Sequence, residues 1–106
     1  MESANSSAAR DGVMRTAQAL IRDDARVAHA FRAMQDRGLP KNMAEVEIAL
    51  ALVCCIWETS RGLPDRFAQV CERLAGGLTL EQLFPDSLRD SRQTLRGYDR
   101  SAGKSA

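Results

Sequence analysis

Aromatic residues are scarce in this sequence, and so are lysine and histidine. Phe, Trp and Tyr make up 5% of the 106 residues, histidine occurs once, at His29, and lysine only at Lys41 and Lys104. Because hydrophobic residues still reach 44%, we expect a globular protein with an aliphatic core of Leu, Val, Ile, Ala and Met. The length indicates a single domain, of a size that is only marginally stable as a monomer.

Long apolar runs are also missing. The longest, Ile48 to Trp57, has ten residues, whereas a membrane-spanning helix needs about 20. The first ten residues, MESANSSAAR, lack the apolar segment of a secretory signal. We therefore expect a cytoplasmic protein without a membrane partner.

Cysteine is present in an odd number and without the spacing of a metal or redox motif. Cys54 and Cys55 are adjacent and Cys71 stands apart, which excludes a disulfide framework. We expect three buried, structural thiols, with redox sensing through Cys55 and Cys71 as the alternative. The sequence has no Glu-x-x-His pair, phosphate-binding loop or catalytic serine motif, so we expect no metal, no cofactor and no enzymatic activity.

Charge of one sign is not in excess either, since the net charge is +1. A global field that would attract nucleic acid is therefore absent. A local basic stripe near the C-terminus has helical spacing and consists of Arg89, Arg92, Arg96 and Arg100. Nearby aspartates dilute it, so we interpret it as a solvated face and keep weak nucleic-acid binding as an alternative.

What the sequence does contain is helical periodicity of its apolar residues. It predicts an all-α fold, a compact bundle of four to five helices around a central apolar helix at 43–60. The other helices are expected at about 10–22, 24–37 and 64–75, followed by a short one that starts after Thr79 and a weak amphipathic stretch at 86–97. We expect one helical domain at 10–97 between two disordered tails at 1–9 and 98–106. Whether the first two helices are continuous stays open.

Helix ends are marked by capping residues. Asp23 or Asp24 is expected to cap the second helix, and Asn42 with Glu45 to form a capping box at the third. Pro64 is expected in the first turn of the fourth helix. Thr79 and Gln82 predict another capping box, at the short helix.

The central helix is too apolar to be covered on one side only. When the residues are placed at 100° intervals around the helix axis, two faces can be distinguished. The wide face carries mainly large side chains, namely Val46, Ala49, Leu50, Leu52, Val53, Ile56 and Trp57. The narrow face carries Ala44, Glu47, Ala51, Cys54, Cys55 and Glu58. Its small residues would allow another helix to approach closely, so the narrow face is a possible interaction face, most simply in a homodimer. The alternative is a small-ligand or enzyme site that uses Glu47, Cys54 and Glu58.

Residues 42–67 resemble a bacterial all-helical family of unknown function with the pattern H-x-A-E-H, then L-W-E, an Arg, a Gly, and P-D before an aromatic residue. The stretch NMAEVEIALALVCCIWETSRGLPDRF aligns Ala44-Glu45, Ile56-Trp57-Glu58, Arg61-Gly62 and Pro64-Asp65 with that pattern. The two histidines of the family are replaced by Asn42 and Val46. The resemblance implies a bacterial helical protein and carries over no activity.

The sequence thus favours a non-enzymatic helical module for protein interaction or homo-oligomerisation. Its partner would be a second copy of itself or another protein.

Overall fold

The computed structural model describes residues 2–86, with side chains from Asp11 onward. Within these residues every regular element is a helix. In chain order they are α1 (Glu2–Asp23), α2 (Ala25–Asp36), α3 (Lys41–Ser60), α4 (Phe67–Ala75) and α5 (Leu80–Leu83). The predicted all-α bundle of four to five helices is therefore confirmed.

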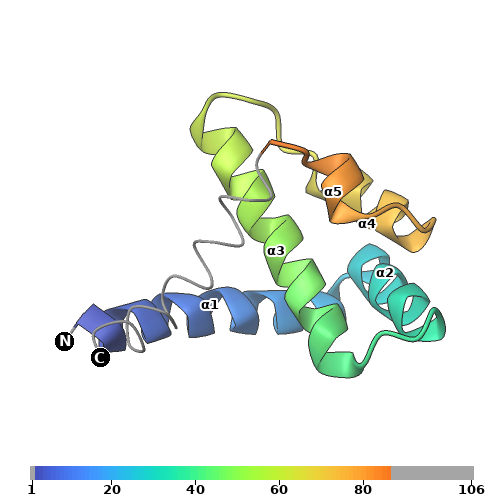
Figure 1. Cartoon of the computed structure of the whole chain (residues 1–106), viewed down its shortest axis with the longest axis horizontal. Coiled ribbons are helices and arrows are strands. Elements are labelled where there is room, and N and C mark those ends of the chain that lie inside the picture. The colour runs from blue at the N-terminus through green and yellow to red at the C-terminus, as the bar shows by residue number, and fades with distance from the viewer. Residues whose placement is uncertain (1, 87–106) are drawn as a thin grey trace.

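The helices pack around α3 (Figure 1). Helix α1 crosses α3 and extends beyond the rest of the bundle, whereas α2, α4 and α5 lie together on one side of α3. Helix α2 packs against α1, α3 and α4. The arrangement gives α3 neighbours on more than one side, as its composition requires.

The middle of α3 forms the centre of the hydrophobic core. From Ile48 to Cys55 every residue except Leu52 is buried. The core around this segment includes Ala17 of α1, Val27 of α2 and Val70 of α4. Aliphatic and sulfur-containing side chains fill it, with Phe84 as the only fully buried aromatic among the described residues. The expectation of a central apolar helix is confirmed.

Asp24 separates α1 from α2. Its backbone is extended, with φ −112° and ψ 119°, and its carboxylate accepts hydrogen bonds from the backbone N–H groups of Arg26 and Val27. These groups have no partner inside the helix that they begin. The predicted cap is confirmed, and the first two helices are distinct.

Two predicted helix starts are wrong. Helix α3 begins at Lys41 after Pro40, which makes no side-chain cap, so Asn42 and Glu45 do not form a capping box. Proline fixes φ near −65°, and the φ of −61° and ψ of 155° at Pro40 already set the chain to enter the helix. Asn42 then lies inside the first turn, where its side chain cannot cap.

Helix α4 begins at Phe67 instead of Pro64. The carboxylate of Asp65 accepts a hydrogen bond from the backbone N–H of Phe67. This bond gives a partner to an N–H group at the start of the helix, which therefore begins after Pro64. The predicted box at α5 is confirmed, because the Thr79 hydroxyl accepts from the N–H of Gln82 and the Gln82 side chain accepts from that of Thr79.

The N-terminal end of the chain differs from the prediction. Helix α1 starts at Glu2, so residues 2–9 continue the helix expected from residue 10. Their glutamate and three alanines are good helix formers. The amphipathic stretch expected at 86–97 and the tail at 98–106 lie almost wholly outside the described residues.

No helix in the described part of the chain has both the length and the apolar character needed to cross a bilayer.

Candidate functional site

The narrow face of α3 points into the protein. Ala44, Ala51 and Cys54 have no exposed surface, and Cys55 is 3% exposed. They are covered within a single chain, so the predicted interaction face is wrong as an accessible surface. The physical reason is that the small side chains allow close packing of this chain's own helices, which is the same property that suggested close approach by a partner.

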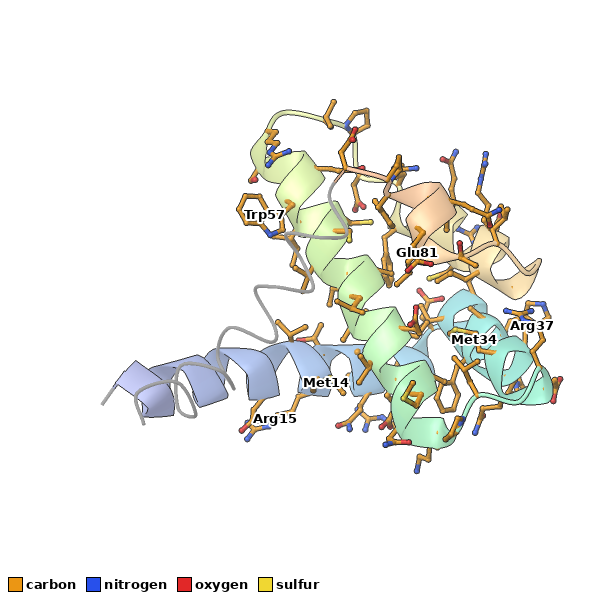
Figure 2. The ribbon with its side chains drawn as sticks, in the orientation of Figure 1. Met14, Arg15, Met34, Arg37, Trp57 and Glu81 are labelled. Carbon is orange, nitrogen blue, oxygen red and sulfur yellow. The ribbon has the colours of Figure 1, made fainter. Side chains whose placement is uncertain are left out.

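Glu47, at the margin of that face, is half-buried and lines a pocket of about 210 Å³. The pocket lies where α2, α3 and α5 meet, and its other lining residues include Met34, Arg37 and Glu81 (Figure 2). Pockets for small molecules usually hold about 300–1,000 Å³. The pocket beside Glu47 is smaller than that range.

Glu58 lies further along α3, and both of its carboxylate oxygens accept hydrogen bonds from Arg66. Arg66 donates from Nε to Oε1 at 2.9 Å and from Nη2 to Oε2 at 2.8 Å. These hydrogen bonds hold the pKa of Glu58 below its ordinary value, although burial opposes the shift. The same pair raises the pKa of Arg66. The two hydrogen bonds from Arg66 thus favour the ionised form of Glu58.

The ligand site predicted from Glu47, Cys54 and Glu58 is not assembled in the structure. Glu47 and Glu58 line two separate pockets, and Cys54 is enclosed in the core. The three residues share one face of α3, yet different neighbouring segments cover that face along its length.

Cys54, Cys55 and Cys71 are buried and form no disulfide with one another. Burial is the main cause that raises the pKa of Cys55 to about 12, with further contributions from Asp65 and Glu58. Burial likewise raises the pKa of Cys71 to about 11. Because the thiolate is the reactive form, both thiols are protected in the folded state, as expected for structural cysteines.

Two arginines that the sequence analysis did not single out connect distant segments. Arg66 also donates to the carbonyl of Leu83 at 2.7 Å, and its guanidinium lies 4.5 Å from the ring centre of Phe84. It therefore joins α3 to the end of α5. No local pattern indicates this role, because the partners lie 8 and 17 residues away.

Arg37 does the same between α2 and α4. Its side chain donates to the carbonyls of Leu74 at 2.7 Å and Ala75 at 3.3 Å, at the C-terminal end of α4. Carbonyls at a helix C-terminus lack partners within the helix and carry partial negative charge. Local sequence patterns do not indicate this contact, because the partners lie 37 and 38 residues away.

The wide face of α3 is covered in the middle and open at both ends. Near the N-terminal end Met43 is 52% exposed and Val46 40%, and near the C-terminal end Ile56 is 54% exposed. Trp57 is half-buried and projects from the side of α3 away from α4 and α5 (Figure 2). The guanidinium of Arg61 stacks over its ring at 5.2 Å from the centroid. We call Met43, Val46, Ile56 and Trp57 the outer side of α3.

Metal ligands do not gather anywhere in the described residues, where no group of three or more His, Cys, Asp and Glu could hold an ion. His29 is exposed on α2. The basic stripe of Arg89, Arg92, Arg96 and Arg100 lies outside the described residues.

Comparison of the chain with family models, curated proteins and solved structures finds no match. The resemblance of residues 42–67 to a bacterial helical family therefore stays an expectation.

Proposed function

We propose that this protein is a non-enzymatic interaction module that forms a homodimer through the outer side of α3. The observation that carries the proposal is the exposure of large apolar side chains on the helix that otherwise forms the core. Met43, Val46 and Ile56 each expose 40% or more of their surface. Burying such side chains against a partner removes apolar surface from water, which favours association.

The arrangement of the outer side suits a second copy of the same chain. Val46 and Trp57 are eleven residues apart, which is about three helical turns, so they share one side of α3. A dimer with two-fold symmetry would pair the two exposed ends of this side, Met43 with Val46 and Ile56 with Trp57, on either flank of the middle that the chain itself covers. Such an interface uses the same surface twice, as closed dimers do.

Trp57 and Arg61 add the residue types that most often dominate binding energy at interfaces. Their stacked pair presents an aromatic ring with a cation over its face. A charged rim beside an apolar centre is the usual anatomy of an interface.

Light scattering coupled to size exclusion tests the proposal with the full chain at tens of micromolar. We expect a dimer that dissociates to a monomer in the variants Val46→Glu and Ile56→Glu. Leu78→Glu is the matched control, because Leu78 is also exposed, at 37%, but lies between α4 and α5. A wild-type protein that is strictly monomeric would exclude the homodimer.

A bacterial origin and a cytoplasmic location belong to the same proposal. They are supported by the resemblance of residues 42–67 and by the composition of the sequence.

A further inference from the structure

The pocket that contains Glu58 lies at the turn between α3 and α4 (Figure 1). Its volume is about 510 Å³, which falls within the range of about 300–1,000 Å³ that is usual for small-molecule pockets. It is therefore large enough for a small organic ligand, unlike the pocket beside Glu47. None of its lining residues belongs to the outer side of α3, so a ligand here would be independent of the proposed homodimer.

Local hydrogen bonds fix the shape of this pocket. The N–H of Leu63 donates to the carbonyl of Glu58 at 3.0 Å and closes the end of α3. The carboxylate of Asp65 accepts from the N–H of Phe67 at 3.0 Å and starts α4. The two hydrogen bonds from Arg66 to Glu58 join the start of α4 to α3. The pocket is thus formed before any ligand arrives, as ligand sites usually are.

One wall of the pocket is apolar and accessible. It consists of Leu63, which is 52% exposed, together with Pro64 and Ala68, which are also exposed. A short aliphatic group placed against these side chains would remove apolar surface from water, which favours binding. Apolar walls with a few polar groups are the usual composition of a ligand pocket.

The charged groups give the pocket one negative charge in excess. Arg66 and Glu58 compensate each other, because both oxygens of Glu58 accept from the guanidinium. Asp65 is left without a cationic partner among the described residues, and only its Oδ1 accepts a hydrogen bond, from the N–H of Phe67. The C-terminal end of α3 and the N-terminal end of α4 both border the pocket, and their partial charges are opposite in sign and offset each other.

The nearby thiol of Cys55 is consistent with this excess of negative charge. Burial is the main cause that raises its pKa. Among the charged groups, Asp65 and Glu58 raise the pKa further, and together they raise it by more than Arg66 lowers it. Negative charge close to a thiol disfavours the thiolate, so the field around the turn between α3 and α4 is negative.

From this geometry we propose that the pocket binds a small organic cation, that is, an ammonium or guanidinium group on a short apolar stem. The stem lies against the wall of Leu63, Pro64 and Ala68, and the cation lies beside the carboxylate of Asp65. Gln69 also lines the pocket, and its amide oxygen is a second acceptor for the N–H groups of the ligand.

The experiment compares three probes with the same six-carbon stem and different head groups, namely hexylammonium, hexanol and hexanoate. Each is titrated into the full-length, isotope-labelled protein, and binding is followed by the chemical shifts of the backbone amides. We expect saturable shifts within residues 58–69. Hexylammonium should bind about two- to fivefold more tightly than hexanol, the gain expected for a partly exposed ion pair. Hexanoate should bind most weakly.

Two variants separate the cation site from the apolar wall. Asp65→Asn keeps an oxygen that can accept from the N–H of Phe67 but removes the charge, so hexylammonium should bind no more tightly than hexanol. Ala68→Phe fills the pocket from an exposed position and should weaken the binding of all three probes. Glu72→Gln is the matched control, because Glu72 lies on α4 outside the pocket and its side chain is 65% exposed. It should leave all three affinities unchanged.

The comparison of probes in the wild-type protein decides the proposal even if a variant fails to fold. Hexanol or hexanoate binding as tightly as hexylammonium would overturn the assignment of a cationic ligand. Shifts that are absent from residues 58–69, or that occur only on the outer side of α3, would overturn the site itself.

Discussion

The guanidinium of Arg66 and the carboxylate of Glu58 meet in a two-pronged pair, with donor–acceptor distances of 2.9 and 2.8 Å. The pair bridges the turn after α3, and through the carbonyl of Leu83 it reaches the end of α5. A single side chain thus ties together three segments that are separate in the sequence. The geometry matches the planar fork of arginine to the two carboxylate oxygens.

This pair predicts a loss of stability in acid. The pKa of Glu58 in the folded protein lies below its ordinary value of 4.5 because Arg66 donates to the ionised form. A carboxyl group with a lowered folded-state pKa contributes stability above its unfolded pKa and loses that contribution as pH falls through its folded pKa. We expect Glu58→Gln to lower the free energy of unfolding by about 1.5–3 kcal/mol at neutral pH. Urea unfolding from pH 7 to pH 2 should show the gap to wild type closing below about pH 4. A gap independent of pH would argue against an ionic origin.

Arg37 predicts a second, separate loss of stability. Replacing it with alanine removes two hydrogen bonds to the end of α4 and should lower the free energy of unfolding by about 1–2 kcal/mol. Arg32→Ala is the control, because Arg32 is exposed on the same helix, and its effect should stay within about 0.5 kcal/mol. Chemical denaturation at neutral pH measures both. Equal effects of the two variants would mean that the contact with α4 contributes nothing.

Asp24 and Asp23 are adjacent acids with different expected roles. Asp24 caps α2 through two backbone N–H groups, so Asp24→Ala should destabilise the protein by about 0.5–2 kcal/mol. Asp23 only pairs with Arg22 at 3.3 Å on an exposed surface, and Asp23→Ala should change stability by less than about 1 kcal/mol. Thermal unfolding followed by circular dichroism compares the two. A larger loss of stability in Asp23→Ala than in Asp24→Ala would mean that the boundary between α1 and α2 is not at Asp24.

Two isoleucines of α3 test which side of the helix is inside. Ile48 has no exposed surface, whereas Ile56 is 54% exposed. Ile48→Ala should reduce the free energy of unfolding by about 2–5 kcal/mol, because the substitution leaves a cavity in the core. Ile56→Ala should reduce it by less than about 1 kcal/mol. Urea unfolding at a protein concentration low enough to exclude association makes the comparison. Similar losses would mean that both sides of α3 are packed within one chain.

Local sequence features predicted those parts of the fold that short-range chemistry controls. The caps at Asp24 and Thr79 were predictable because each side chain binds N–H groups two or three residues away. The start of α3 was not, because it has no side-chain cap and is set by the backbone conformation at Pro40. Arg37 and Arg66 were missed because their partners are brought near by the fold.

The sequence by itself determined that α3 would be the centre of an all-α bundle. A helix whose apolar residues cover most of its circumference must be buried on several sides, whatever surrounds it. Only the tertiary structure decided which side of α3 faces inward. Both faces carry apolar residues, so their hydrophobicity did not distinguish them. The small side chains Ala44, Ala51 and Cys54 allow neighbouring helices close approach and occupy the core, which leaves Met43, Val46 and Ile56 outside.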